Sequence, residues 1–119
     1  MNVSQTGDFN SWVAFFAEGL RAQAAETLRR VEALLEYQDE LRAMVQERQI
    51  RGVRARIIED LVGQPILTPT WAAGSYGVSY QAANDAIGRL VRDGVLQEMT
   101  GRKYGRLFAS RRVLATIEG

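Results

Sequence analysis

Residues 67–99 run LTPTWAAGSYGVSYQAANDAIGRLVRDGVLQEM and contain the signals that decide the fold. Thr68 as an N-cap and Pro69 at the first helical position predict that a short helix begins here. Gly77 suits a left-handed turn, and Ser79 suits the N-cap of a second helix. Two helices joined by a tight turn that contains glycine are typical of a helix-turn-helix motif.

The segment after this motif predicts a wing. An Asp-Gly pair at residues 93–94 ends the helix that follows Ser79. Residues 95–99 and 106–109 predict two strands, and residues 100–105 between them form a basic turn flanked by glycine. Three helices followed by a hairpin are the order of a winged helix.

Two further helices are predicted on either side of this unit. One precedes the motif and ends at Gly63, before Pro65, and the other covers residues 110–118 with Ser110 as its cap. We expect Trp71 to lie in the core as the anchor of its short helix. The apolar positions that we expect to be buried are Ile50, Val53, Ile57, Ile58 and Leu61, then Ala83, Ala86, Ile87, Leu90 and Val91, then Val113, Leu114 and Ile117.

The front of the chain predicts one long helix. Asp8 suits its N-cap, and no proline interrupts residues 8–47, in which apolar residues recur at steps of three and four. A continuous helix over this range is about 58 Å long at 1.5 Å per residue. A second apolar stripe requires a partner, which is the rest of the chain, a second copy or another domain. Its members are Phe15, Leu34, Tyr37 and Met44.

We therefore expect a mainly α protein with a small β-hairpin. In this interpretation, residues 1–47 form a long amphipathic helical segment, and residues 48–119 form a winged helix-turn-helix domain. The 119 residues are 46% hydrophobic and 24% charged, which is ordinary for a globular protein. With no Cys and no His, the chain lacks disulfides, imidazole and thiolate metal ligands, and Cys or His catalytic groups. We expect no catalytic residue, no metal and no cofactor.

Charge is spread unevenly along the chain. Residues 1–47 carry eight acids against four arginines, whereas residues 86–119 carry seven basic residues against three acids. A polyanionic partner is therefore expected to meet the C-terminal part. The uncharged residues 61–83 are broken by two prolines and three glycines, so they do not predict a membrane span, and the N-terminus lacks a signal-peptide pattern. These features favour a cytoplasmic protein.

An aromatic segment near the N-terminus gives the chain a resemblance to a known family. Residues 12–16, Trp-Val-Ala-Phe-Phe, follow Gly-Asp at residues 7–8 and lead into the long helix. Gly-Val-Ser at residues 77–79 and Thr-Gly-Arg-Lys at residues 100–103 lie in the predicted turn and wing. This order resembles the C-terminal region of Fic-family proteins, in which a W-x-x-F-F segment follows the catalytic helices and a winged helix often closes the chain. The similarity runs from about residue 7 to the end.

The resemblance covers only the non-catalytic part of that family. Fic proteins that transfer AMP from ATP to a hydroxyl use a motif with a catalytic His, a following acid, a Gly-Asn-Gly turn and an Arg for phosphates. The chain contains neither a His nor a Gly-Asn-Gly sequence, so we expect no catalysis from it. The alternatives are a fragment of a longer protein and the product of a short stand-alone gene.

The predicted winged helix offers two surfaces to a DNA duplex. On the second helix of the motif, Gln81 and Asn84 suit bidentate contacts to adenine, and Arg89 suits guanine or phosphate. Ser79 can contact a phosphate from the helix N-terminus. The predicted DNA-binding residues are Ser79, Tyr80, Gln81, Asn84 and Arg89 on the helix, and Arg102, Lys103 and Arg106 in the wing. Double-stranded DNA is the expected partner, and the long helix is a candidate for homodimerisation.

These residues also have purely structural interpretations. Ser79 can serve as a cap alone, and the acids Asp85 and Asp93 can neutralise the arginines at positions 89 and 92. Asp85 on the same face repels phosphate, and the charge of the C-terminal part is modest for a polyanion binder. Two hypotheses follow. One is a DNA-binding module with a regulatory or targeting role for a Fic enzyme, and the other is a protein-interaction module attached to such an enzyme.

Overall fold

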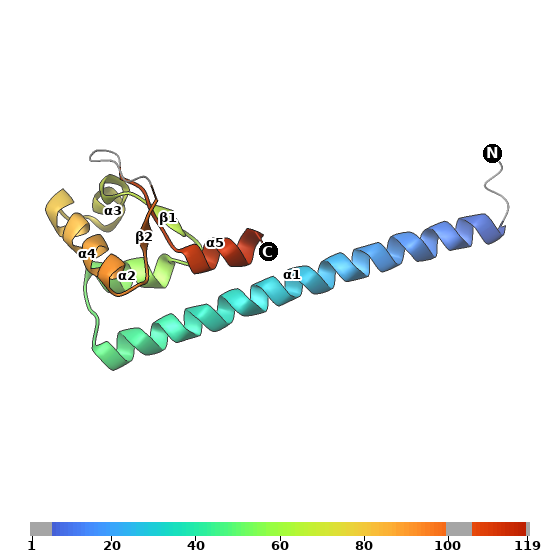
Figure 1. The fold of residues 1–119 in the computed structure, drawn as a ribbon, viewed down its shortest axis with the longest axis horizontal. Coiled ribbons are helices and arrows are strands. Elements are labelled where there is room, and N and C mark those ends of the chain that lie inside the picture. The colour runs from blue at the N-terminus through green and yellow to red at the C-terminus, as the bar shows by residue number, and fades with distance from the viewer. Residues whose placement is uncertain (1–5, 100–105, 119) are drawn as a thin grey trace. The chain divides into compact units, whose positions relative to one another are not determined.

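A computed structural model describes residues 6–99 and 106–118, with side chains from residue 9 onward. In chain order the elements are α1 (Thr6–Arg48), α2 (Val53–Asp60), β1 (Ile66–Leu67), α3 (Pro69–Tyr76), α4 (Tyr80–Arg92), β2 (Gln97–Glu98), β3 (Phe108–Ala109) and α5 (Arg111–Glu118) (Figure 1). The predicted fold class is confirmed, with a long N-terminal helix followed by a helix-turn-helix and a small antiparallel sheet. None of the helices in the described ranges is long and apolar enough to cross a membrane.

The chain forms two compact units. The first covers Met1–Glu32 and the second covers Ala33–Gly119, so that α1 contributes to both. Residues 33–47, which the sequence groups with the front helix, belong to the second unit. The helix begins at Thr6, so Asp8 lies inside the helix and is not its N-cap. Helix ends are the least sharply specified part of such a pattern, because the first turn lacks internal hydrogen-bond partners.

α3 and α4 form the predicted helix-turn-helix, and their caps are the residues that the sequence indicates. Thr68 Oγ1 accepts a hydrogen bond from the backbone N–H of Trp71 at 3.1 Å. Ser79 Oγ accepts one from the backbone N–H of Ala82 at 3.0 Å. Gly77 between the helices has a φ of 66°, the left-handed conformation that glycine adopts without steric strain. The predicted starts of both helices are therefore confirmed.

The sheet is antiparallel, with β3 between β1 and β2. In this central strand Phe108 lies opposite Leu67 of β1 and opposite Glu98 of β2. No pattern in the sequence predicts β1, because two residues are too few for alternation to be visible. The basic turn predicted over residues 100–105 lies outside the described residues.

β2 is shorter than the strand predicted over residues 95–99. The backbone N–H groups of Val95 and Leu96 both donate to the carbonyl of Leu90, at 2.9 and 3.2 Å. These two residues therefore satisfy the C-terminal end of α4, and their side chains are buried in the core. The ladder begins only at Gln97.

One hydrophobic core holds the second unit together. Its buried members come from every helix and strand of that unit except β2, and are Leu41, Ile50, Ile57, Ile58, Leu61, Leu67, Ala72, Tyr76, Ala83, Ala86, Ile87, Leu90, Val95, Leu96, Phe108, Ala109 and Val113. The predicted buried face of α4 is confirmed apart from Val91, which is half-buried. Ile117 is 47% exposed, so its predicted burial is wrong. It lies in the last turn of α5, past the buried Val113.

The C-terminal part of α1 packs on this core. Leu41 is 4% exposed, and Tyr37 and Met44 pack against the buried cluster. For these two members of the second stripe, the partner is the rest of the chain. Arg42 and Glu59 join α1 to α2 through an ion pair of 2.8 Å, and the Arg42 guanidinium lowers the pKa of the Glu59 carboxyl below its usual value.

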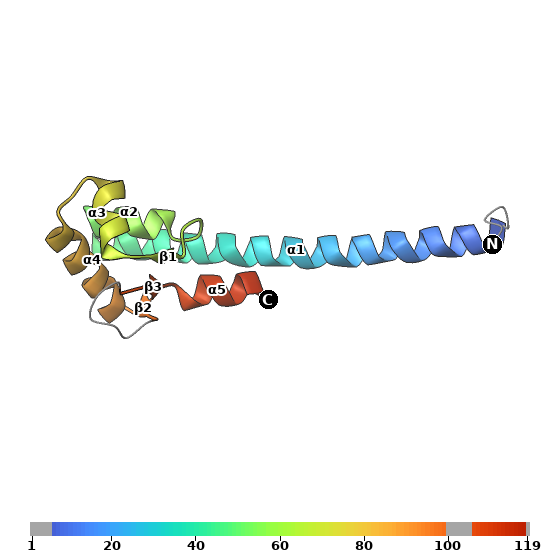
Figure 2. The same ribbon diagram turned by 90° about the horizontal axis from the view of Figure 1, so that it is seen from above.

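α5 is attached to the same part of α1 (Figures 1 and 2). The guanidinium of Arg112 bonds both oxygens of the Glu40 carboxylate, at 2.6 and 3.2 Å, and lies 4.3 Å from the ring centre of Tyr37. A bidentate pair of this kind fixes the orientation of the guanidinium plane. Ser110 caps α5 as predicted, because its Oγ accepts a hydrogen bond from Val113 N–H at 3.3 Å.

Tyr76, rather than Trp71, is the buried anchor of α3. Tyr76 is 8% exposed, and its hydroxyl donates to Asp60 at 2.9 Å. Arg56 donates to the Tyr76 carbonyl at 3.0 Å and lies over the ring. Trp71 is 38% exposed and meets the ring of Tyr76 edge-on, so its predicted burial is wrong. On this short helix the core-facing positions are Ala72 and Tyr76, one turn apart, and Trp71 lies beside them.

The Tyr76 hydroxyl is expected to stabilise the fold in a pH-dependent way. Tyr76→Phe should lower the free energy of unfolding by about 1–2 kcal/mol near neutral pH, because a hydrogen bond to a carboxylate is lost. Burial, and then the hydrogen bond to Asp60, raise the pKa of Tyr76 above its ordinary value. The unfolded chain ionises first, so this stabilisation is complete below about pH 10 and decreases at higher pH.

Urea unfolding at neutral pH and above about pH 10 measures this difference between the wild type and the variant. Tyr80→Phe is the matched control, since Tyr80 is exposed and its hydroxyl has no partner among the described residues. Equal losses for the two variants, or a Tyr76→Phe effect that is independent of pH, would contradict this account.

Candidate nucleic-acid interface

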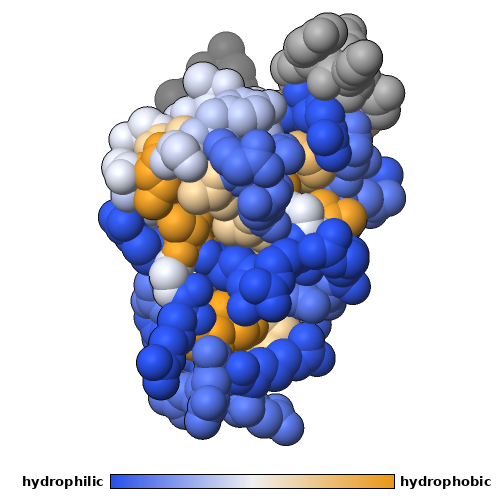
Figure 3. Space-filling view, turned by 90° about the vertical axis from the view of Figure 1, so that its left-hand side faces the viewer, coloured by the Kyte–Doolittle hydropathy of each residue, from blue (hydrophilic) through white to orange (hydrophobic). Residues whose placement is uncertain are grey.

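α4 and its cap carry five of the predicted residues, and three of them share its outward face. Ser79 caps the helix, and Tyr80, Gln81 and Arg89 are exposed along it, while Asn84 is half-exposed. Gln81, Asn84 and Arg89 share one face because the opposite face of the same helix is buried. Ser79 and Tyr80 lie at the start of the helix, at the spacing of the buried Ala83 and Ile87, and are exposed there. Figure 3 shows the end of the molecule that lies on the left of Figure 1, and hydrophilic side chains cover most of it. The helix and its cap therefore combine amide, hydroxyl and guanidinium groups.

A shallow hollow interrupts this face at Gly88. Its lining residues are Asn84, Asp85, Gly88, Arg89 and Arg92. A side chain at position 88 would meet open space, so the hollow exists because glycine has none. Such a gap lets another molecule approach the helix backbone closely.

Gln81 is held in place by Asp85. The Gln81 amide nitrogen donates to Asp85 Oδ1 at 3.2 Å, one helical turn away. This contact uses one of the two amide hydrogens and one of the two lone pairs expected on that oxygen. The second amide hydrogen and the amide oxygen of Gln81 stay available. Asp85 therefore orients Gln81 as well as adding a negative charge.

Ser79 has the structural role that its position indicates. Its Oγ accepts the capping hydrogen bond from Ala82, which stabilises the start of α4. The hydroxyl hydrogen is not used by this bond, because a serine hydroxyl both donates and accepts. A phosphate contact at the N-terminus of α4 is therefore compatible with the cap.

The ion pairs expected on α4 are not the ones that form. Asp93 contacts Arg54 at 3.5 Å and Arg48 at 4.0 Å, both from residues before the helix-turn-helix. Within the described residues, no acid lies within ion-pair distance of Arg89 or Arg92. The prediction that Asp85 and Asp93 neutralise these two arginines is therefore wrong. Arg54 lies within reach of Asp93 because α2 packs beside α4 (Figure 1).

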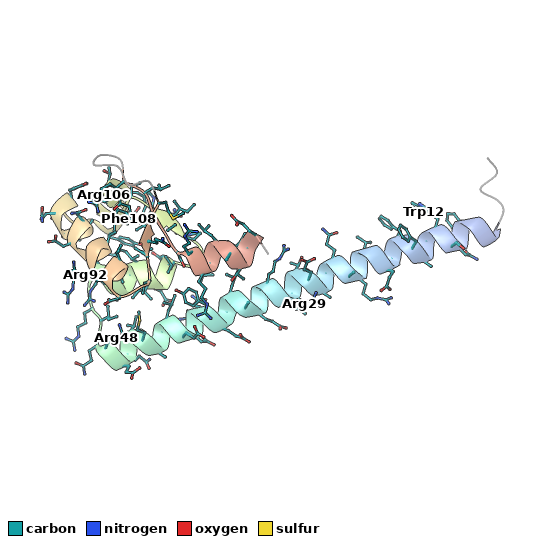
Figure 4. All side chains as sticks on the ribbon, viewed as in Figure 1. Trp12, Arg29, Arg48, Arg92, Arg106 and Phe108 are labelled. Carbon is teal, nitrogen blue, oxygen red and sulfur yellow. The ribbon has the colours of Figure 1, made fainter. Side chains whose placement is uncertain are left out.

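The wing arginine that the structure describes is already paired. Arg106 donates to Glu98 at 3.3 Å and its guanidinium lies 5.1 Å from the ring centre of Phe108. Figure 4 shows Arg106 beside Phe108. Glu98 offsets the charge that this side chain would offer a phosphate. The other two predicted wing residues, Arg102 and Lys103, lie outside the described residues.

The sequence does not indicate that the arginines of residues 48–54 lie near the end of α4. The only signal for them is a local excess of basic residues over positions 48–60, with four arginines against two acids. Arg48 and Asp93 are far apart in sequence, so no helical spacing indicates their contact. The described residues contain no group of His, Cys, Asp and Glu side chains that could hold a metal ion.

Comparisons with known proteins add little to this geometry. No protein-family model matches the sequence, and no curated protein matches it. Among solved structures, the chain is similar to RV1404 from Mycobacterium tuberculosis, with a TM-score of 0.49 and 19% sequence identity, over 75% of this chain and 67% of that chain. A similarity of this size carries no functional argument. The resemblance to Fic-family proteins stays a prediction.

The cap at Ser79 is expected to contribute measurably to the stability of the fold. Ser79→Ala should lower the free energy of unfolding by about 1 kcal/mol, because the first turn of α4 loses its acceptor. Ser79→Asp should keep the stability, because aspartate caps as well as serine and its charge favours a helix N-terminus. Urea unfolding tests both, with Ser75→Ala, an exposed serine inside α3, as the control. A loss with Ser79→Asp as large as that with Ser79→Ala would show that the cap is not the cause.

Proposed function

We propose that this chain is a DNA-binding winged-helix module without catalytic activity, in which α4 lies in the major groove. The observation that carries the proposal is the face of α4, where Arg89 and Arg92 have no acid within ion-pair distance among the described residues. Asn84 lines the same hollow, and Gln81 lies on the same side of the helix one turn before it. Unneutralised guanidinium groups attract phosphates, and amides can recognise base edges. The two properties together are those of a sequence-reading helix.

Gln81 and Asn84 are the residues to which we assign base recognition. A Gln or Asn side chain recognises adenine by donating one N–H to N7 and accepting from N6. Gln81 keeps one N–H and its oxygen available while Asp85 fixes its orientation. A side chain that is already ordered loses less conformational entropy on binding. Asp85 thereby supports specificity even though it weakens attraction to phosphate.

The role of this module is proposed from the resemblance at the sequence level. The aromatic segment and the winged helix support attachment to, or cooperation with, a Fic enzyme that transfers AMP. In that setting, DNA binding would have a regulatory or targeting role. The catalytic residues of such an enzyme would belong to another chain or to another part of a longer one.

Fluorescence anisotropy of a mixed-sequence duplex, titrated with the chain at several salt concentrations, tests DNA binding. We expect micromolar affinity whose logarithm falls with log salt by about 0.9 for each phosphate neutralised. No binding at low salt would overturn the proposal. Sequence preference is then tested with a duplex enriched from a random pool.

Gln81→Ala and Asn84→Ala should each reduce the preference for the enriched duplex over mixed DNA by about 1–3 kcal/mol and leave the salt dependence unchanged. Gln46→Ala removes the same kind of group from α1, where the side chain is exposed, and should change neither quantity. Loss of affinity for both duplexes to the same extent would contradict the assignment of base recognition to these amides.

A specific observation favours a second candidate function, homodimerisation through the first unit. Phe9, Val13, Phe16, Leu20, Leu28 and Val31 lie on one side of α1 by helical spacing, and all are exposed. The neighbouring charges pair within the same helix, as Arg21 does with Glu18 and Arg30 with Glu26. Two copies could therefore join these apolar sides without bringing unpaired like charges together. An exposed apolar surface of this kind is typical of an association site.

Leu20→Asp should shift the chain toward the monomer, measured by sedimentation or light scattering over a range of concentrations, because it places a charge in the apolar side. Ala22→Asp adds the same charge about 200° around the helix and should leave the association unchanged. A wild-type chain that is monomeric at every concentration would exclude this candidate. Equal effects of the two variants would also argue against it.

A further inference from the structure

Four exposed arginines gather where the end of α4 meets the turn between α1 and α2. Arg89 and Arg92 lie one turn apart on α4, and Arg48 and Arg51 lie at the end of α1 and in the turn after it. The contact between Arg48 and Asp93, at 4.0 Å, brings the two pairs together. Figure 4 shows Arg48 and Arg92 at the same end of the second unit. We refer to Arg48, Arg51, Arg89 and Arg92 as the arginine patch.

The turn that holds Arg51 is a defined structure. Ile50 N–H donates to the carbonyl of Val45 at 3.0 Å, and Gln49 before it has a φ of 53°. A left-handed residue followed by this hydrogen bond is a standard helix ending. The side chain of Ile50 is buried in the core, and Gly52 then takes a φ of 72°. The buried Ile50 fixes the turn and leaves the exposed Arg51 directed away from the core.

Asp93 holds Arg48 near the end of α4 but does not neutralise the arginine patch. Its closer partner is Arg54, whose side chain is only 19% exposed and which joins the start of α2 to the end of α4 at 3.5 Å. Asp93 already balances Arg54, and Asp85 is an acid in the same hollow as Arg89 and Arg92. The four exposed guanidinium groups therefore keep a net positive charge. Within the described residues, Arg51, Arg89 and Arg92 have no acid within ion-pair distance. Like charges on one surface repel one another, and a bound anion reduces that repulsion.

We propose that the arginine patch binds the phosphate backbone of a DNA duplex beside the groove that α4 enters. This inference rests on the proposed function and extends the contact surface from α4 to the turn between α1 and α2. The planar guanidinium donates two parallel hydrogen bonds to a phosphate, so several arginines can follow a strand. Contacts to phosphate fix how a protein lies on DNA and carry no sequence information themselves. The patch therefore supplies affinity, and the amides of α4 supply sequence preference.

The test compares two double variants with the same change in net charge. Arg51→Gln with Arg92→Gln removes two charges from the patch, at positions that have no described ion pair. Arg29→Gln with Arg111→Gln removes two exposed arginines outside the patch, one from the first unit and one from α5. Circular dichroism and thermal unfolding first show that all three proteins fold. Both variants and the wild type are then titrated against a mixed-sequence duplex and the enriched duplex by fluorescence anisotropy at several salt concentrations.

The patch variant should give a log–log salt dependence that is shallower by about 1.8, since each phosphate contact contributes about 0.9. Its affinity should fall to the same extent for mixed and enriched duplexes, and the control variant should behave as the wild type does. A wild type that binds no DNA overturns the proposed function and this inference together. A wild type that binds, with equal salt dependence in all three proteins or an equal reduction in both variants, overturns this inference alone.

Discussion

Burial of one face of α4 is the interaction on which the rest of the second unit depends. Ala83, Ala86, Ile87 and Leu90 are all buried, and they pack against α2 and α3. A helix that buries one side must present the other side to solvent, so the core decides which residues form the candidate interface. The core thus orients Gln81, Asn84 and Arg89 without touching them. Stability and the proposed recognition are therefore properties of opposite sides of one helix.

The sequence predicts local features well, because their causes are local. The caps at Thr68 and Ser79 and the left-handed Gly77 depend on residues within one turn, and all three are confirmed. The contacts of Asp93 could not be predicted in this way, since they join residues that are distant in the chain. The nearby acid Asp85 accepts from Gln81, and Arg89 has no ion pair among the described residues. Gln81 and Arg89 are both four residues from Asp85, so helical spacing does not indicate which of them it contacts. β1 was missed since two residues give no pattern.

The two candidate functions use surfaces of different chemistry. The face of α4 and the arginine patch are polar and positively charged, whereas the exposed side of α1 in the first unit is apolar with charges paired beside it. Attraction to the first kind weakens as salt increases, and association through the second kind does not. A chain that had both properties could bind DNA as a dimer. Two copies of α4 would then be expected to contact two half-sites.

The order of the sheet has a consequence for solubility. β3 is the central strand, so both of its edges are occupied, and the outer strands β1 and β2 have two residues each. Unpaired backbone groups at the edge of a sheet are a template on which other chains can add strands and aggregate. In the described part of this sheet, each open edge is only a few residues long. This described part of the sheet therefore offers other chains little backbone to extend.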